Sequence, residues 1–138
     1  MSDESPRKNR ILVVEDDEAT RESVVIKLQK KGFEADGAKD GREALEKIRK
    51  NPSCLGILLD LRMPNKDGFM FMEEKNKDGA LRSIPVVIFS NLGQDEFIER
   101  ATQLGAKGYL IKANHSIGGI IDEVESCFIN NICHIDHE

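Results

Sequence analysis

The sequence is poor in several residue types, and each shortage excludes a class of protein. It has no tryptophan, a single tyrosine and only three cysteines, Cys54, Cys127 and Cys133, among 138 residues. Because that number is odd and the cysteines lack the spacing of paired metal ligands, we expect reduced thiols, with neither a disulfide framework nor a zinc site. No apolar run approaches the roughly 20 residues of a membrane span, and residues 1–10 are too polar for a signal peptide. These absences favour a cytoplasmic protein with no membrane contact.

The chain also lacks a segment in which charges of one sign are concentrated. The chain carries 20 Lys and Arg against 25 Asp and Glu, a net charge of -5, and the basic residues are scattered. A dedicated nucleic-acid face needs clustered basic residues, so we expect no direct contact with nucleic acid. The length of 138 residues fits one domain, which buries roughly two thirds of the surface of its unfolded chain. The expected partner is a protein or a small phosphorylated molecule.

Short apolar runs rich in β-branched residues alternate along the chain with stretches of helical periodicity. This alternation is typical of repeated βα units around a parallel sheet. Right-handed crossovers predict a three-layer α/β/α sandwich in the flavodoxin-like strand order 2-1-3-4-5. The expected strands are residues 11–14, 33–38, 55–60, 86–90 and 107–111, and the expected helices are residues 18–31, 41–50, 69–78, 97–104 and 116–130. We expect one domain over residues 9–130, with residues 1–8 and 131–138 as disordered tails.

Two of the expected strands end directly on carboxylates. Glu15, Asp16 and Asp17 follow the first strand, and Asp60 ends the third. In the predicted strand order, the binding crevice lies outside the carboxyl ends of strands one and three. Two like charges about 4 Å apart repel by on the order of 4 kcal/mol at an effective dielectric of 20, so a convergent cluster requires a divalent cation. Asp17 is an exception, because it falls in the first turn of a helix, where the helix dipole favours acidic side chains.

Magnesium is the cation that such a set of oxygen donors fits best. We expect Asp16 and Asp60 to bind it directly and Glu15 to reach it directly or through water. The backbone carbonyl of Arg62 completes the expected set of protein ligands.

Asp60 is also the expected nucleophile toward phosphorus, forming an acyl phosphate while the metal neutralises its charge. Lys112 ends the last strand and would pair with a carboxylate at rest and with a phosphoryl oxygen afterwards. Ser90 ends the fourth strand and could bind a phosphoryl oxygen, although a plain turn residue is an open alternative. Tyr109 is either a packing residue or a switch that turns inward when Ser90 moves.

Four segments match a known pattern in type and order: residues 11–17 (ILVVEDD), 58–64 (LLDLRMP) with Gly68, 87–90 (VIFS) and 105–112 (GAKGYLIK). Over about residues 9–130 the chain resembles the receiver domain of bacterial two-component response regulators. The resemblance implies that a histidine kinase or phosphotransfer protein phosphorylates Asp60, with a magnesium requirement and self-catalysed loss of the phosphoryl group. It also implies that Ser90 and Tyr109 couple the phosphoryl group to a surface of helix four, strand five and helix five, which a downstream target protein reads.

The chain departs from the family pattern at two positions. The family commonly has proline, joined by a cis bond, after the lysine, but here Ala113 follows Lys112. A cis bond at a non-proline residue costs roughly 2.5 to 4 kcal/mol, so we expect this loop to take another path. Asn91 follows Ser90 where the family often has alanine, and its amide could restrict or position an attacking water. We expect this asparagine to alter the rate of dephosphorylation.

Four functions can be compared with these sequence features. The first is a stand-alone phosphoacceptor protein, a monomer or weak dimer that is no enzyme beyond its self-catalysed reactions. The second is the receiver part of a longer DNA-binding response regulator, although residues 131–138 do not read as a Pro- or Ser-rich linker. An aspartyl phosphatase would want an acid two residues after the nucleophile, where Arg62 stands. A nucleotide hydrolase lacks its Gly-rich loop.

Overall fold

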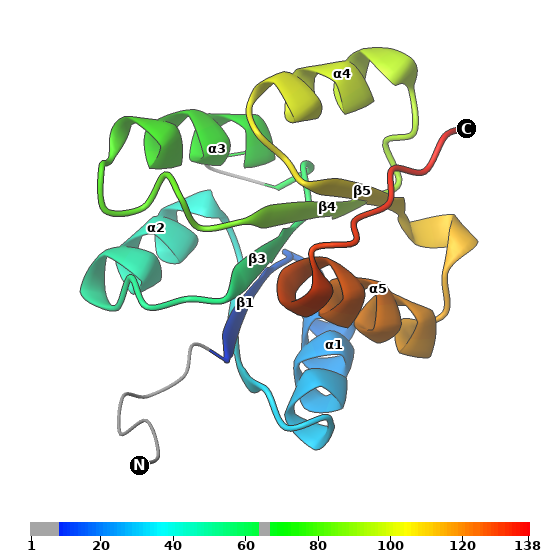
Figure 1. Cartoon of the computed structure of the whole chain (residues 1–138), viewed down its shortest axis with the longest axis horizontal. Coiled ribbons are helices and arrows are strands. Elements are labelled where there is room, and N and C mark those ends of the chain that lie inside the picture. The colour runs from blue at the N-terminus through cyan, green and yellow to red at the C-terminus, as the bar shows by residue number, and fades with distance from the viewer. Residues whose placement is uncertain (1–8, 64–66) are drawn as a thin grey trace.

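The structure is a computed structural model that describes residues 9–63 and 67–138. They form a five-stranded parallel sheet with helices on both faces (Figure 1), in the strand order β2-β1-β3-β4-β5. The three-layer architecture and the strand order predicted from the sequence are therefore confirmed. The strands are β1 (Arg10–Val14), β2 (Glu34–Ala38), β3 (Gly56–Leu59), β4 (Val86–Ser90) and β5 (Gly108–Ile111). The helices are α1 (Glu18–Lys30), α2 (Gly41–Lys50), α3 (Gly68–Lys77), α4 (Asp95–Gln103) and α5 (Ile117–Asn130), with a 3-10 turn, η1 (Lys112–Asn114), before α5.

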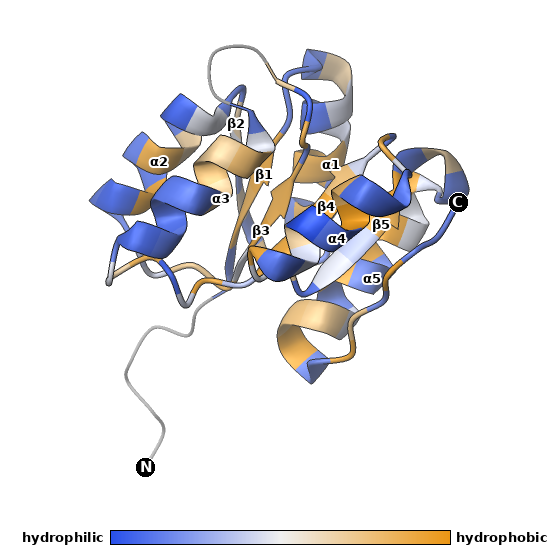
Figure 2. Ribbon diagram, turned by 90° about the horizontal axis from the view of Figure 1, so that it is seen from above, coloured by the Kyte–Doolittle hydropathy of each residue, from blue (hydrophilic) through white to orange (hydrophobic). Residues whose placement is uncertain are grey.

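The central strands β1, β3 and β4 are apolar except for Arg10 and Ser90 at their ends, because helices cover both faces of the sheet. In Figure 2 these strands are mostly coloured as hydrophobic, whereas the helices around them alternate between hydrophilic and hydrophobic residues. Alternate residues of each strand enter opposite cores. In β1, Ile11 and Val13 face α1 and α5, where they pack with Val24, Leu28, Ile120 and Val124. Leu12 and Val14 face α2, α3 and α4, where they share a core with Leu45, Ile48, Met72 and Ile98.

Short polar side chains fix the starts of four helices. Asp17, Asp40, Asp67 and Ser116 each accept a hydrogen bond from the backbone N–H three residues further on. Such a cap satisfies one of the free donors of the first helical turn. Asp17 is thus the N-cap of α1, in agreement with its expected place at a helix start.

Two glycines end helices in the left-handed backbone region. Gly32 and Gly105 both have φ of 98°, and they follow α1 and α4 closely. Only glycine adopts this conformation at little cost, which explains why the sequence pattern marked both helix ends correctly.

The expectation of reduced cysteines was wrong for two of the three. Cys127 and Cys133 form a disulfide, and Cys54 is buried and takes no part in a disulfide. An odd number of cysteines argues against a framework in which every cysteine is paired. It does not exclude a single disulfide between two of them, such as the one at the end of α5.

Residues 131–138 are also not the disordered tail that their position predicted. The backbone of this segment bonds to β5 through Tyr109, and Ile135 forms a parallel bridge with the same residue. Residues 1–8, the other expected tail, and Pro64 of the family pattern lie outside the described residues. Among the described helices, none has the length and apolar character needed to span a membrane.

Candidate phosphoacceptor site

The carboxyl ends of three strands bring the predicted site residues together. Val14 of β1 pairs in register with Leu59 of β3, so the next residues, Glu15 and Asp60, leave the sheet side by side. The Asp60 N–H donates to the Val14 carbonyl at 2.9 Å, which extends the ladder by one bond and fixes the backbone that carries the carboxylate. Lys112 follows Ile111 at the end of β5 and reaches across to the same point.

Glu15, Asp16 and Asp60 form a compact cluster of acids. One carboxylate oxygen from each lies within 4.8 Å of those of the other two. Glu15 and Asp60 are buried, whereas Asp16 is exposed at the rim. Three oxygen donors at this spacing, one of them open to solvent, suit a hard divalent cation that keeps part of its water shell.

Lys112 joins two of these acids. Its Nζ lies 2.8 Å from Glu15 Oε2 and 3.0 Å from Asp60 Oδ2, and 5.3 Å from the centre of the Phe89 ring. Burial acts to lower the pKa of Lys112, but the two carboxylates outweigh it and raise the pKa above its ordinary value. The ammonium group is therefore held charged between the two carboxylates.

Burial has a large effect on Glu15. It raises the pKa of Glu15 from 4.5 to about 7, and the hydrogen bond from Lys112 offsets only part of this shift. The neighbouring Asp60 raises the pKa of Glu15 further, as expected for two carboxylates that share a site. Near neutral pH the cluster can therefore exchange a proton for a cation.

Ser90 and Tyr109 are both buried and are linked through one residue that the sequence did not point to. Ser90 Oγ accepts a hydrogen bond from the Leu92 N–H at 3.3 Å. The Tyr109 hydroxyl donates to the Leu92 carbonyl. Burial, with a smaller contribution from the Asp60 charge, raises the pKa of Tyr109 to about 12, so the hydroxyl stays a donor at physiological pH. Leu92 thus connects the end of β4 to the middle of β5.

The loop after Lys112 follows an all-trans path. No peptide bond is cis within the described part of the chain, and residues 112–114 form the turn η1. The Ala113 N–H donates to Asn91 Oδ1 at 3.1 Å, a bond that proline at this position could not make. The two departures from the family pattern are therefore partners, and Lys112 reaches both carboxylates without a cis bond.

A family model for the response regulator receiver domain matches residues 11–122. The chain belongs to the response regulator receiver domain family. Receiver domains are signalling domains and not classical enzymes, and as a family they bind Mg2+ at an acidic pocket.

Relatives and solved structures agree with this assignment. Response regulator RR06 of Streptococcus pneumoniae is 37% identical over 102 residues, which cover 74% of this chain and 45% of the relative. The transcriptional regulatory protein PdtaR of Mycobacterium tuberculosis is 32% identical over 117 residues, which cover 84% of this chain and 55% of PdtaR. The chain therefore spans about half the length of these relatives. The chemotaxis response regulator CheY4 of Vibrio cholerae superposes with a TM-score of 0.78 at 27% identity, over 86% of this chain and 97% of CheY4.

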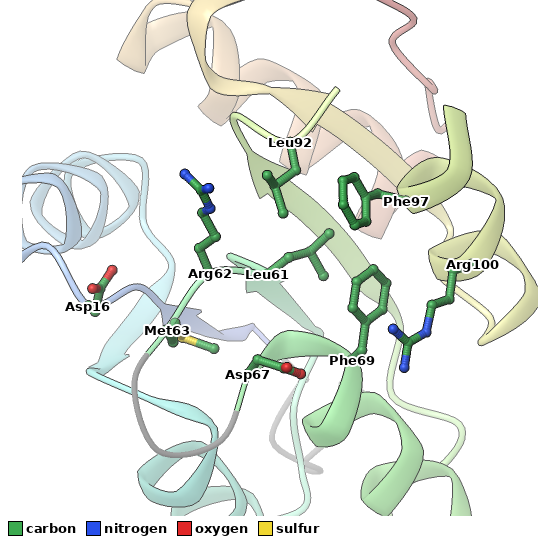
Figure 3. Close-up of a pocket in the computed structure, with 9 residues that line it drawn as sticks. All are labelled: Asp16, Leu61, Arg62, Met63, Asp67, Phe69, Leu92, Phe97 and Arg100. Carbon is green, nitrogen blue, oxygen red and sulfur yellow. The ribbon is translucent and has the colours of Figure 1, made fainter. Parts of the chain in front are cut away.

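Beside the acids of this receiver domain is an open cavity of about 570 Å3 (Figure 3). Asp16 and Arg62 lie on one side of it, and Leu92 lies close to Phe97 on the other. The Arg100 guanidinium stands 4.1 Å from the centre of the Phe69 ring. The cavity thus extends from the rim of the acidic cluster to α4, and Leu92, which bonds to Ser90 and Tyr109, forms part of its wall.

Sequence reasoning missed a supporting residue in this receiver domain. Arg21 of α1 donates from Nη1 to the Glu15 carbonyl at 2.8 Å, and so it ties the loop that carries the acids to the helix that follows. Nothing in the sequence separates Arg21 from an ordinary surface arginine, because its role depends on how α1 folds back over the loop.

Proposed function

We propose that this chain is a phosphoacceptor of a two-component phosphorelay, in which Asp60 takes a phosphoryl group in a Mg2+-dependent reaction. The observation that carries the proposal is the Asp60 carboxylate, buried at a strand end, with Lys112 Nζ at 3.0 Å and two further acids beside it. A buried acid cluster with one cation bridging two members is costly as a purely structural feature, which favours a functional role.

In the proposed reaction an Asp60 oxygen attacks phosphorus of a phosphohistidine. The P–N bond breaks, its electron pair returns to the imidazole nitrogen, and the product is an acyl phosphate on Asp60. Bound Mg2+, held by Glu15, Asp16, Asp60 and the Arg62 carbonyl, would supply charge neutralisation for this transfer. Lys112, which donates to Asp60 Oδ2 at 3.0 Å, would pair with a phosphoryl oxygen, and the Arg62 N–H, which donates to Asp60 Oδ1 at 3.2 Å, would keep the carboxylate oriented. Attack by water on phosphorus then breaks the bond between phosphorus and the Asp60 oxygen, which returns the free carboxylate and releases inorganic phosphate.

Ser90 and Tyr109 are the proposed switch. If Ser90 turns to bind a phosphoryl oxygen, its bond to the Leu92 N–H is lost, and Leu92 also holds the Tyr109 hydroxyl. A change at Asp60 can therefore reach β5 through two hydrogen bonds. We propose that a downstream target protein reads this change on α4, β5 and α5, and that a histidine kinase or phosphotransfer protein is the donor. The proposal places the protein in the cytoplasm, as a monomer or weak dimer without direct contact to nucleic acid.

One observation favours a second candidate role. RR06 and PdtaR are about twice as long as the region they share with this chain, and PdtaR is named a transcriptional regulatory protein. This supports a receiver part of a longer DNA-binding regulator. The mass of the protein isolated from its native source distinguishes the two roles, and the chemistry at Asp60 is the same in both.

The phosphoacceptor proposal is tested by incubation with acetyl phosphate and Mg2+, followed by intact mass spectrometry. We expect one added phosphoryl group, absent when a chelator removes Mg2+ and absent in Asp60→Asn. No added mass in the wild type, or the same added mass in Asp60→Asn, would contradict the proposal.

Magnesium affinity should fall in acid because Glu15 must lose its proton to act as a ligand. With the pKa of Glu15 raised to about 7, the carboxyl is ionised at pH 8 and largely protonated at pH 6. We expect the affinity, measured by isothermal titration calorimetry, to drop by about tenfold between pH 8 and pH 6. Glu15→Gln should bind more weakly but with little change over this range. A wild-type affinity that is constant from pH 8 to pH 6 would contradict the assignment of Glu15.

Asn91→Ala should change the lifetime of the phosphorylated form. The substitution removes the hydrogen bond that Ala113 donates to Asn91 Oδ1, and it loosens the turn beside Lys112. We expect a loss of about 1 kcal/mol in the free energy of unfolding, together with faster loss of phosphate as the site opens to water. The lifetime is read from the decay of the phosphorylated mass, and an unchanged decay rate would rule out a role for Asn91.

A further inference from the structure

The segment of residues 131–138 lies along β5, the edge strand of the described sheet, as Figure 1 shows at the red end of the chain. The Tyr109 N–H donates to the His134 carbonyl at 3.0 Å, and the Asp136 N–H donates to the Tyr109 carbonyl at 2.8 Å. These two bonds and the parallel bridge from Tyr109 to Ile135 add a short strand to the sheet. Gly108 permits the close approach, since a Cβ there would lie 3.0 Å from the His134 carbonyl oxygen.

Side chains of the segment fill further positions along the same edge. Asp136 Oδ2 accepts a hydrogen bond from the Ile111 N–H at 2.9 Å and lies 2.6 Å from His115 Nε2. His134 Nδ1 lies 2.6 Å from Glu123 Oε2 on α5. The segment therefore covers the backbone edge of β5 and contacts α5, which is the face where a downstream target is proposed to bind.

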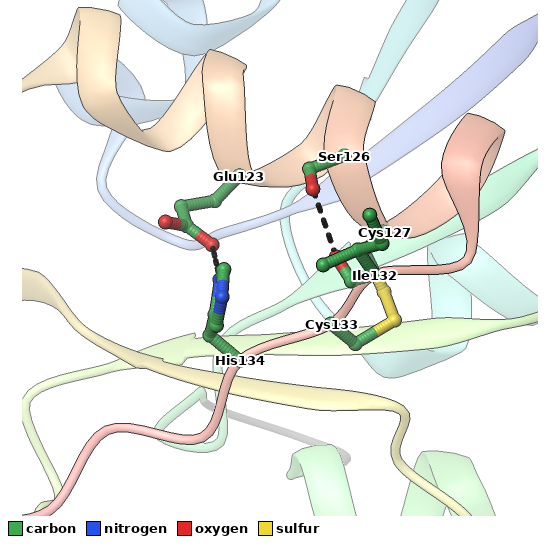
Figure 4. The surroundings of a disulfide bond; sticks show 6 residues. All are labelled: Glu123, Ser126, Cys127, Ile132, Cys133 and His134. Atoms are coloured by element: carbon green, nitrogen blue, oxygen red, sulfur yellow. Dashed lines mark hydrogen bonds and ion pairs between the residues drawn. A yellow bond between two sulfur atoms is a disulfide. The ribbon is translucent and has the colours of Figure 1, made fainter.

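A disulfide fixes the start of this segment (Figure 4). Cys127 belongs to the last turns of α5, and Cys133 follows six residues later, after Asn131 has reversed the chain in the left-handed region with φ of 59°. The Ser126 hydroxyl donates to the Ile132 carbonyl at 3.0 Å across the same turn. The disulfide thus holds the chain in a direction that brings residues 134–138 alongside β5.

Without the disulfide, polar contacts alone hold the segment, with little apolar burial to support them. Ile132 and Ile135, the apolar side chains of the segment, are 56% and 39% exposed and bury little surface. Ordering a residue costs about as much free energy as one intramolecular hydrogen bond contributes, so polar contacts fewer in number than the residues that they order leave the docked and free states near balance. A crosslink at the base of the segment shifts that balance by restricting the free state.

We propose that residues 131–138 are a redox-released cover on the β5 edge, and that an extended peptide strand of a partner protein binds this edge after release. The proposal rests on the proposed function for the identity of this face as the target surface. Disulfides are rare in the cytoplasm, where they are mostly transient and redox-sensing. The edge of β5 pairs with residues 134–136 as a parallel strand, and its Ile111 N–H donates to the Asp136 carboxylate. The expected partner is therefore an extended peptide segment with an acidic residue that accepts the same hydrogen bond.

Release is a thiol–disulfide exchange with a protein dithiol of the thioredoxin class. One thiolate of the reductant attacks a sulfur of the Cys127–Cys133 bond and forms a mixed disulfide with it. The second thiol of the reductant then attacks this mixed disulfide and releases the protein with both cysteines reduced. Two electrons and two protons pass to the two cysteines of the cover, and the reductant becomes a disulfide.

Amide hydrogen exchange followed by NMR on the full chain tests the cover. In the oxidised protein we expect the Tyr109, Ile111 and Asp136 amides to be protected, and reduction should speed their exchange by about tenfold or more. Amides in the centre of the sheet, such as Leu58, should not change. Cys133→Ser without reductant should match the reduced wild type, and adding reductant to it should have no effect. Equal protection before and after reduction, or three free thiols in the oxidised protein, would overturn the proposal.

A peptide tests the partner. A peptide of residues 131–138 that carries Cys133→Ser is titrated to millimolar concentration into the reduced and into the oxidised protein, because the effective concentration of the tethered segment is also about millimolar. We expect shifts of the Tyr109 and Ile111 amide signals in the reduced protein alone, and at least a tenfold weaker effect for the same peptide carrying Asp136→Asn. Binding elsewhere, or no binding, would overturn the partner assignment. Both experiments use unphosphorylated protein without Mg2+ and are repeated in Asp60→Asn, so their outcome does not depend on phosphoryl chemistry.

Discussion

Lys112→Ala is expected to lower the free energy of unfolding by about 3 kcal/mol at pH 8 without Mg2+. The substitution leaves Glu15 and Asp60 buried next to each other with no cation between them, and removing one partner of a buried ion pair typically costs about 3 to 5 kcal/mol. We take the lower end because the Lys112 side chain is 20% exposed. The measurement is urea unfolding followed by circular dichroism.

The pH dependence of this loss identifies its cause. The pKa of Glu15 is already raised to about 7, so at pH 5.5 the carboxyl carries a proton and the repulsion between the two acids is relieved. The penalty of Lys112→Ala should therefore shrink in acid and grow as the pH rises through 7. The exposed Lys107, at the other end of β5, serves as the control, and its change to alanine should stay within about 0.5 kcal/mol. A penalty that is the same at pH 5.5 and pH 8 would mean that Lys112 acts by packing and not by charge.

Gly68→Ala is the second substitution with a large expected effect. A Cβ on Gly68 would lie 2.7 Å from the Asp60 carbonyl oxygen and 2.8 Å from the Leu61 Cα, and both contacts are with backbone. The backbone at Asp60 and Leu61 would have to move, at a cost of about 1 to 3 kcal/mol. Because Asp60 is the proposed nucleophile, we also expect phosphorylation by acetyl phosphate to slow by about tenfold or more.

Helix propensity alone predicts that Gly68→Ala stabilises the protein, so the observed sign distinguishes it from the close contact. Gly68 is the first residue of α3, and alanine in a helix is favoured over glycine by up to about 1 kcal/mol. Gly79 is the matched control, since a Cβ there has no atom within 4 Å. We expect Gly79→Ala to be near neutral in stability and in phosphorylation rate. A Gly68→Ala protein as stable and as reactive as the wild type would show that the close contact is not constraining.

The local pattern of the sequence was enough to predict the sheet and the placement of the acids. Apolar runs that stop at Glu15 and Asp60 mark strand ends, and the rules of parallel sheets place neighbouring strand ends together. Lys112 followed from the same reasoning, even though Ala113 replaces the usual proline. The structure places all three residues within contact distance.

Features that depend on how distant segments meet could not be predicted. The link from Ser90 to Tyr109 passes through Leu92, whose contribution is its backbone N–H and carbonyl and therefore leaves no trace in the sequence. Lys75 of α3 is 3% exposed and donates to the Arg82 carbonyl, and burial lowers the pKa of Lys75 to about 8; no pattern in the sequence distinguishes it from the other lysines. The disulfide of Cys127 also depends on a chain reversal at the end of α5.

The central claim is that Asp60 carries the phosphoryl group, and reductive trapping tests it most directly. Borohydride reduces an acyl phosphate on aspartate to homoserine, so the protein is treated with acetyl phosphate and Mg2+, reduced, digested and sequenced by mass spectrometry. We expect homoserine at position 60 and at no other aspartate, with the signal lost when Mg2+ is removed. Homoserine at Asp16 in place of Asp60, or a stable phosphate on Ser90, would contradict the assignment.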